Sequence, residues 1–350
     1  MAFPPDMNLQ DRRRLAALGF LLVLGVAAVA AMFAVLILNG KSPASAQTVR
    51  EYNLEIVGTD IDYGNGNVWH AWTFKNADDP TGTVPGPQLE ATVGDKLIVH
   101  VTNKLDIIHS FHTHLTNYDL KYDGSQLNVI TGIGAGAMIP PGGTYTYEFE
   151  PDKPGIYEYH CHSADGGHHI SEHMHQGLYG AIVIRGKDEP KPQNEMTIFM
   201  GEMGFDTTGD SVPPYIMNGL GIPGGEHALE DIYTQGGVPA VAAQFNKTLP
   251  VFDAKVGEQV TLHLVNIGDQ VHTFHAHGIE LYSKEALRGE AWPSNVVPLS
   301  PGTADTVTFT YTNPGLWLFH CHVVAHADAG MIGLFNVTAS TETTQQPPGS

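Results

Sequence analysis

Residues 91–114 read ATVGDKLIVHVTNKLDIIHSFHTH, and residues 254–277 read AKVGEQVTLHLVNIGDQVHTFHAH. The two stretches are copies of one pattern, in which apolar and polar residues alternate before closely spaced histidines. A second pair of similar stretches, 140–162 and 300–322, follows the first pair, and each of these ends in His-Cys-His. Strict alternation is the signature of strands with one buried face. Because the copies lie about 160 residues apart, each copy is a whole domain and not a unit of a solenoid.

The turn residues between these strands complete the prediction of the fold. The chain holds 39 Gly and 23 Pro, and Pro-Gly and Asn-Pro-Gly elements punctuate the alternating runs. We therefore expect an all-β protein with two antiparallel β-sandwiches of the Greek-key type. The first domain is expected at 47–187 and the second at 188–340. We read 187–250, which is rich in Gly and Pro, as the connection plus the opening strands of the second domain, and 341–350 as a flexible polar tail.

The overall composition excludes some classes of protein. Hydrophobic residues make up 42% of the 350 residues, which is enough for a real core and excludes wholesale disorder. The formal net charge is -20, from 37 acidic and 17 basic side chains. Nucleic acids are bound by basic surfaces, so no nucleic-acid partner is expected.

The amino terminus predicts a membrane segment. Leu15 to Leu38 are 24 residues without a charged side chain, which is long enough for a helix to span a bilayer. Arg12 to Arg14 precede them and favour a cytoplasmic tip. The sequence thus predicts that 1–46 are a tip and a membrane anchor, and that the rest lies outside the cytoplasm. Ala44-Ser45-Ala46 resembles a cleavage site, so export after removal of a signal near Ala46 is the alternative.

The two cysteines lie in the same context, as His160-Cys161-His162 and His320-Cys321-His322. They could form one disulfide, but their flanking histidines point to metal thiolates. On a strand, side chains at i and i+2 share a face and the side chain between them points the other way. Both imidazoles of each triplet therefore emerge on one face, and the thiol emerges on the other.

The same parity sorts the remaining histidines. It places His109 with Cys161 inside the first sandwich and His272 with Cys321 inside the second. Four imidazoles of each domain point outward together, and eight that converge suit a cluster of nitrogen-binding metal ions. These are His112, His114, His160 and His162 in the first domain, and His275, His277, His320 and His322 in the second.

The inner sites match blue copper, which is bound by two His, one Cys and a weak axial ligand. In the second domain the set is His272, Cys321, His326 and Met331. In the first domain the glycine spacing favours His109, Cys161 and His173, with Leu178 at the axial position. A leucine cannot donate, so the reduction potential of that copper would be raised. An alternative register uses His169 and Met174.

As a set, the motifs HSFHTH, EYHCH, HTFHAHG and FHCHVVAHADAGM resemble the two-domain multicopper oxidases, the group that contains the small laccases. The likeness covers most of residues 50–340. It implies two cupredoxin-like domains, and an oxidoreductase in which a type 1 copper takes single electrons from a donor and passes them to a trinuclear cluster that reduces O2 to water. It also implies ligands for the cluster. The type 2 copper would use His112 and His275, and the type 3 pair would use His114, His160, His162, His277, His320 and His322.

The resemblance further implies a homotrimer with each cluster between the first domain of one chain and the second domain of its neighbour. Tyr118 and Asp123 resemble residues near the cluster that help deliver electrons and protons. Small laccases lack a cysteine in the first domain, so Cys161 brings the chain closer to the subgroup with a blue site in both domains. The electron donor stays open among phenols, metal ions and redox proteins.

Two other functions are compatible with the same fold. A copper-containing nitrite reductase has the same pair of sandwiches, but its catalytic copper needs only three His and its second domain lacks the His-Cys-His triplet. A non-enzymatic copper or electron-transfer protein would show blue absorbance without O2 turnover.

Overall fold

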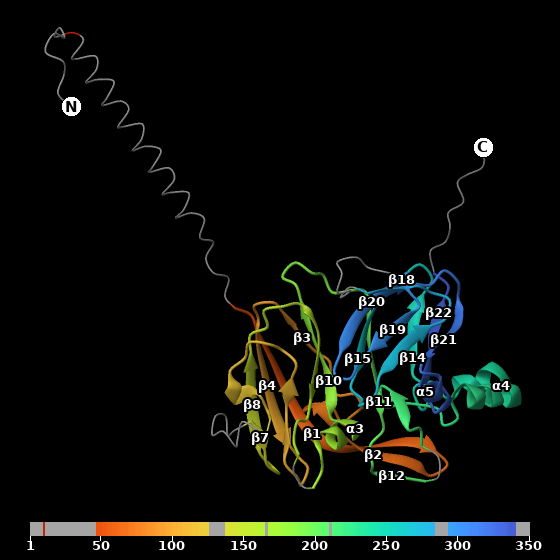
Figure 1. Cartoon of the computed structure of the whole chain (residues 1–350), viewed down its shortest axis with the longest axis horizontal. Coiled ribbons are helices and arrows are strands. Elements are labelled where there is room, and N and C mark those ends of the chain that lie inside the picture. Colours follow the sequence, from red (N-terminus) through yellow and green to blue (C-terminus); the bar gives the residue numbers. More distant parts are fainter. Residues whose placement is uncertain are drawn as a thin grey trace. The chain divides into compact units, whose positions relative to one another are not determined.

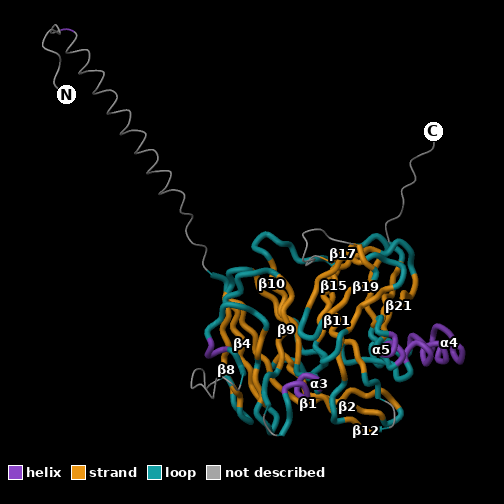
Figure 2. The backbone as a smooth tube through the Cα atoms, viewed as in Figure 1, coloured by secondary structure: helices purple, strands orange, loops and turns teal. Residues whose placement is uncertain are grey.

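The computed structural model describes residue 10 and residues 47–125, 137–164, 167–209, 212–283 and 293–340. Most regular structure in these ranges is strand (Figure 1, Figure 2). No helix among them is long and apolar enough to cross a membrane. The predicted membrane span at Leu15–Leu38 and the tail at 341–350 lie outside the described residues. The described residues from Thr48 onward form one compact unit.

The first sandwich consists of two large sheets and a small two-stranded one. One large sheet has the order β12-β2-β1-β4-β8, and the other has the order β3-β10-β9-β6. The small sheet pairs β5 with β7. The strands are β1 (Val49–Gly64), β2 (Asn67–Asn76), β3 (Leu89–Thr92), β4 (Lys96–Asn103), β5 (His109–Ser110), β6 (His112–Thr113), β7 (Met138–Ile139), β8 (Thr144–Phe149), β9 (Gly155–His160), β10 (Tyr179–Arg185) and β12 (Thr207–Thr208).

The second sandwich repeats this arrangement. Its sheets have the orders β13-β11-β15-β20-β17-β18 and β14-β22-β21-β16-β19. The strands are β11 (Asn194–Glu202), β13 (Tyr215–Met217), β14 (Val251–Lys255), β15 (Gln259–Asn266), β16 (His272–Ala276), β17 (Leu281–Ser283), β18 (Pro293–Ser294), β19 (Val296–Leu299), β20 (Ala304–Thr310), β21 (Gly315–Cys321) and β22 (Ile332–Thr338).

The expectation of antiparallel sheets is only partly correct. Each of the four large sheets also contains one parallel pair, namely β1 with β4, β3 with β10, β11 with β15, and β14 with β22. Parallel neighbours require a long crossover connection, and the long connections of a Greek key supply it. Alternation along a single strand predicts which face is buried but not which strand lies beside it.

The alternation of apolar and polar residues does predict which side chains are buried in the cores of the sandwiches. Along β4, Leu97, Val99 and Val101 are fully buried while the residues between them are partly exposed. Each large side chain buried in this way stabilises the fold by about 1.5–3 kcal/mol. A separate apolar cluster joins the two sandwiches and includes Trp69 from β2 and Phe199 from β11. Because β12 pairs with β2, residues 207–208 belong to the first sandwich's sheet, and the domain limits at 187/188 stay a prediction.

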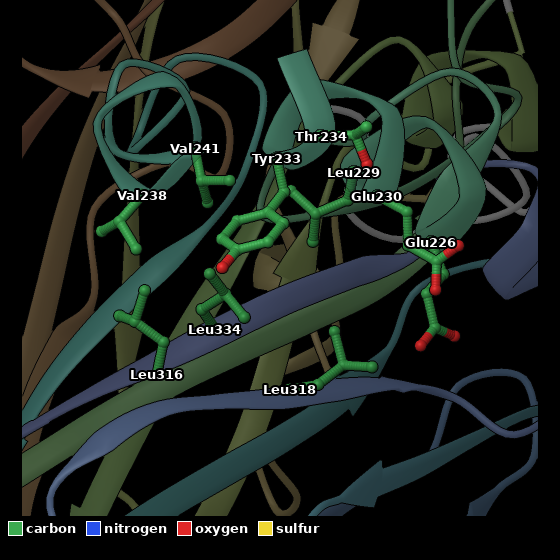
Figure 3. A pocket seen from close by; sticks show the side chains of 10 residues that line it. All are labelled: Glu226, Leu229, Glu230, Tyr233, Thr234, Val238, Val241, Leu316, Leu318 and Leu334. Atoms are coloured by element: carbon green, nitrogen blue, oxygen red, sulfur yellow. The ribbon is translucent and has the colours of Figure 1, made fainter. Parts of the chain in front are cut away.

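Three short helical segments lie near the sites: η1 (Leu120–Tyr122), α3 (Ile170–His175) and α5 (Val324–Asp328). A longer helix, α4 (Gly225–Ala242), lies within 187–250, where the sequence predicted only a connection and strands. Gly237 breaks its helical backbone with a φ of 63°. A cavity of about 490 Å³ lies between α4 and strands β21 and β22, lined by Leu229, Leu318 and other side chains (Figure 3).

Candidate copper centres

The second inner site consists of His272, Cys321 and His326, and all three side chains are buried. The Nδ1 atoms of the two imidazoles are 3.1 Å apart, and they lie 3.9 and 3.8 Å from Cys321 Sγ. His272 opens β16, Cys321 closes β21 and His326 lies on α5. The thiol points into the core, as strand parity predicts.

The first inner site has the same form. His109 Nδ1 and His173 Nδ1 are 3.2 Å apart and lie 3.6 and 3.4 Å from Cys161 Sγ. His173 is buried on α3, whereas His169 is the residue that precedes this helix. The structure therefore brings His173 to the thiol and not His169. Met174 instead packs against the apolar cluster between the sandwiches.

Backbone hydrogen bonds show that the two sites share one register. Cys161 N donates to Leu178 O at 3.0 Å, and Cys321 N donates to Met331 O at 3.1 Å. The glycine before each acceptor has a left-handed φ, 113° at Gly177 and 129° at Gly330. Leu178 and Met331 are therefore equivalent, and both are fully buried.

We expect a Leu178→Met variant to lower the reduction potential of the first inner site. A thioether can donate weakly to an axial position of oxidised copper, and leucine cannot. The expected change is roughly tenfold in the ratio of reduced to oxidised copper, which is about 59 mV for one electron. The measurement is a redox titration of the blue band in a Cys321→Ser background. The matched control is Met331→Leu in a Cys161→Ser background, where the shift should have the opposite sign.

Both inner sites fit a copper ion. Three donor atoms with separations of this size leave the centre of their triangle about 2 Å from each atom, which is the length of a metal–nitrogen bond. Burial lowers the pKa of His109 to about 3, so its imidazole is neutral and can ligate. Two imidazoles and a thiolate in a buried trigonal arrangement are the donor set of blue copper.

The two thiols differ in acidity. Burial raises the pKa of the Cys161 thiol to about 11. Burial acts in the same direction on Cys321, but its interactions with the His272 imidazole and with the Thr273 backbone N–H outweigh burial, and the pKa of that thiol lies below its ordinary value. Backbone N–H groups face both sulfurs, among them that of Ser110 at 3.4 Å from Cys161 Sγ and that of Thr273 at 3.5 Å from Cys321 Sγ. These donors are positioned to stabilise a thiolate.

The outward imidazoles form one group in each domain. His112 pairs across the strands with His160, and His275 pairs with His320 in the same way. The ligand atoms of His112, His114 and His160 lie within 4.8 Å of one another, as do those of His275, His277 and His320. The rings of His162 and His322 lie 4.9 and 5.2 Å from those of His112 and His275. Among the described residues, no such group combines imidazoles of both domains.

Backbone carbonyls fix which nitrogen of these rings faces the metal. His160 Nδ1 donates to Cys161 O, and His320 Nδ1 donates to Cys321 O. His112 Nδ1 donates to Asp123 O, and His275 Nδ1 donates to Asn295 O. A carbonyl only accepts, so Nδ1 carries the proton and the Nε2 lone pair is left for a metal. The Nε2 atoms of His114 and His160 are 3.4 Å apart, and those of His277 and His320 are 3.3 Å apart.

Tyr118 and Asp123 lie beside the first outward group. Tyr118 OH donates to Asp123 Oδ1 at 2.9 Å, and Asp123 Oδ1 is 3.8 Å from His112 Nδ1. Burial opposes ionisation of Asp123, but hydrogen bonds from Ser125 and Tyr118 outweigh it and hold the pKa of this carboxyl below its usual value. The structure thus connects the tyrosine to the imidazole group through one carboxylate.

Sequence reasoning missed an acidic residue in this group. Glu158 lies on β9, two residues before His160, and its side chain is only 4% exposed. Its Oε1 is 3.0 Å from His114 Nε2, and its Oε2 has no hydrogen-bond partner in the described part of the chain. Burial raises the pKa of Glu158 to about 8. A single glutamate on a strand is invisible to a search for His and Cys patterns.

We expect Glu158→Gln to stabilise the copper-free protein at pH 9 and to have little effect near pH 4. The pKa of this carboxyl is near 4.3 in an unfolded chain and about 8 in the fold. Between these values the folded state holds the extra proton, so the contribution of Glu158 to stability is lost as the pH rises through 8. The expected gain at pH 9 is on the order of a few kcal/mol. Urea unfolding at both pH values measures it. The exposed Glu150→Gln is the control, and an equal response of both variants would contradict the prediction.

Aromatic residues that the sequence did not single out cover both inner sites. The Trp72 ring lies 5.4 Å from the rings of both His109 and His173. In the second domain, Tyr215 stacks on His326 with ring centroids 4.0 Å apart. These contacts restrict how the imidazoles can turn. No fixed spacing links an aromatic residue to a distant ligand, so the sequence carried no signal for them.

Comparisons with known proteins agree with this geometry. Two family models, both described as multicopper oxidase, match residues 78–189 and 226–341, which together are well over half of the chain. A probable nitrite reductase-hydroxylamine oxidoreductase fusion protein of Kuenenia stuttgartiensis is 27% identical over 78% of this chain and 29% of its own length. Multicopper oxidase MmcO of Mycobacterium tuberculosis is 30% identical over 59% of this chain and 40% of its own length. The chain therefore spans less than half of either relative.

A solved crystal structure of a multicopper oxidase is similar over almost its whole length. It superposes with a TM-score of 0.65 and 27% sequence identity, covering 85% of this chain and 92% of that chain. The shared fold is the all-β cupredoxin-like one, built from the two sandwiches described above. Members of this family are oxidoreductases that bind copper, and the His and Cys groups of this structure are suited to that metal. The chain belongs to the multicopper oxidase family.

Proposed function

We propose that this protein is a laccase-like oxidase, which takes single electrons from a donor at type 1 copper and reduces O2 to water at a trinuclear copper cluster. Four one-electron oxidations and four protons per O2 give two waters. The observation that carries the proposal is a repeated arrangement, in which an inner site of one cysteine and two histidines adjoins an outward group of four imidazoles. A nitrite reductase needs only three imidazoles at its catalytic copper, and this chain offers eight.

The chain's own residues supply the connection between the two kinds of site. Bound copper supplies the one-electron redox chemistry. Cys321 is joined through the backbone to His320 and His322, so the inner and outer donors are adjacent residues at the end of β21. The hydrogen bond from His320 Nδ1 to Cys321 O adds a second connection between them. Cys161 and His160 repeat this arrangement in the first domain. Tyr118 and Asp123 are proposed to hold and pass a proton beside His112.

The proposed assembly is a homotrimer with a cluster at each subunit boundary. Each outward group supplies four imidazoles, whereas the proposed cluster of three coppers needs eight. A head-to-tail contact brings the first group of one chain to the second group of the next, and such a contact closes into a ring. We also propose that the folded part lies outside the cytoplasm, attached by the segment at Leu15–Leu38 or released after cleavage near Ala46.

The test compares the two acceptors on one preparation. Purified copper-loaded protein is given a phenolic donor with O2, and separately a reduced donor with nitrite under argon. The proposal predicts O2 consumption with four donor molecules oxidised per O2 and no nitric oxide. Nitric oxide release without O2 uptake would instead establish the second candidate, which the nitrite reductase name of one relative favours. Blue absorbance without either reaction would contradict both and indicate an electron-transfer protein.

A further inference from the structure

A carboxylate lies between the two inner sites of the same chain. Glu202 is the last residue of β11, and its side chain is 13% exposed. Its Oε1 is 3.5 Å from His272 Nε2, and its Oε2 is 3.5 Å from His175 Nε2. Both imidazole nitrogens and Glu202 Oε1 are buried, and none of these three atoms has a hydrogen-bond partner within the described residues. Contacts of 3.5 Å are at the outer limit of a hydrogen bond between these atoms.

The surrounding backbone is shaped around this carboxylate. Asp269 N donates to Glu202 Oε2 at 3.0 Å. A Cβ at Gly268 would collide with Glu202 Oε2 and would lie 3.0 Å from His272 Nε2, so only glycine permits this approach. Gln270, which follows Asp269 in the same loop, donates a hydrogen bond to Tyr215 OH, and Tyr215 stacks on His326. The loop that holds the carboxylate therefore also restrains the other imidazole of the second inner site.

The Glu202 carboxylate also contacts the helix that carries one ligand of the first inner site. His175 is the last residue of α3, the helix that carries His173 (Figure 1 shows α3 where the sandwiches meet). The segment after Glu202 packs against the end of this helix, because Phe205 N donates to Gln176 Oε1 and a Cβ at Gly204 would collide with Gln176. On this short helix only Met174 lies between His175, which contacts Glu202, and His173, which faces the Cys161 thiol.

We propose that Glu202 is a positioning residue shared by both inner copper sites: it holds the Nε2–H of His272 and, through His175, the helix that presents His173. This rests on the proposed function, since it needs copper at the inner sites. A carboxylate only accepts, so His272 carries its proton on Nε2 and presents the Nδ1 lone pair to Cys321. Outer partners of this kind orient the ring and raise the basicity of the ligand.

This arrangement predicts that variants of Glu202 and of His175 shift the reduction potential of the second inner site in opposite directions. A Glu202→Gln variant removes the negative charge behind His272, so the imidazole donates less and oxidised copper is less stabilised. The reduction potential of copper at the second inner site should therefore rise by about 59 mV, which corresponds to a tenfold change in the ratio of reduced to oxidised copper. A His175→Leu variant removes the competing donor, so the carboxylate holds His272 more strongly and the potential should fall. His175→Gln keeps a donor and should restore the original value.

The experiment uses the full chain in a Cys161→Ser background, where Cys321 alone can supply a thiolate band. The blue band is titrated against redox mediators, and the EPR hyperfine coupling of the same samples is recorded. Asp269→Asn is the matched control, because this carboxylate lies 3.6 Å from His175 Nε2 but is 65% exposed to solvent, and no ion pair joins it to His272 among the described residues. Circular dichroism establishes that each variant folds.

We expect the reduction potential of the blue band to rise in Glu202→Gln and to fall in His175→Leu. It should return to the original value in His175→Gln and stay unchanged in Asp269→Asn. A blue band that stays at its original potential in both Glu202→Gln and His175→Leu overturns the inference and leaves the proposed function intact. If Glu202→Gln does not fold, the two His175 variants decide alone. Absence of any blue band in the Cys161→Ser parent protein would contradict the proposed second inner site, and the inference with it.

Discussion

The Cys161→Ser/Cys321→Ser double variant should lose all blue absorbance and more than about a hundredfold of its oxidase turnover while keeping its fold. Loss of an outer partner of a metal ligand alone costs roughly 10–100-fold in affinity or activity, so loss of the ligand itself should cost more. A serine hydroxyl is a poor donor to blue copper, and it also breaks the arrangement in which sulfur adjoins two outward imidazoles. The measurement is visible absorbance and O2 uptake on one preparation.

The single variants are the controls for this prediction. Each should lose only one component of the blue absorbance, because each thiol faces its own pair of imidazoles, His109 and His173 or His272 and His326. Each should also keep part of the turnover, since each cysteine adjoins outward imidazoles of its own domain. A double variant that oxidises donors at the original rate would contradict the assignment of the inner sites.

Removing two of the four imidazoles from either outward group should abolish O2 reduction. We expect His160→Gln/His162→Gln and His320→Gln/His322→Gln to lose their clustered copper and to fall to background turnover, although each variant keeps the four outward imidazoles of its other domain. The reason is that each proposed cluster draws on all eight imidazoles of both groups, and the six that remain are too few to hold three metal ions. Copper analysis and EPR measure the loss. The blue sites should remain, which distinguishes loss of the cluster from loss of the fold.

His100→Gln is the matched control for these variants. This histidine lies on β4 and hydrogen-bonds to Thr146 and Glu51, away from both outward groups. It should leave the copper content and turnover unchanged. Full turnover in either of the outward-group variants would contradict the proposed cluster.

Strand periodicity predicted which side chains meet and which face they occupy. Alternation in 155–162 and 315–322 was sufficient to separate Cys161 from His160 and Cys321 from His320, because a period of two is fixed by backbone geometry. The spacing around Gly177 was sufficient to favour His173, and the equivalent hydrogen bonds of Cys161 and Cys321 to Leu178 O and Met331 O show the shared register.

The sequence could not predict features that depend on contacts between distant segments. The parallel pairing of β1 with β4 depends on how long connections cross, which alternation does not encode. Glu158 and Glu202 are isolated carboxylates on strands, and only the folded chain shows that they face His114 and His272. Helix α4 lies in a Gly- and Pro-rich stretch whose weak pattern favours no element.

The two outward-group variants also provide the most direct test of the central claim, that the imidazoles of two chains meet at one shared pocket. The test mixes the inactive variants His160→Gln/His162→Gln and His320→Gln/His322→Gln after dissociation and measures O2 uptake on reassembly. If each cluster lies between chains in a ring, random mixing should restore about one quarter of the wild-type turnover, because one pairing in four joins two intact groups. Mixtures that stay as inactive as their components would contradict a cluster shared between subunits.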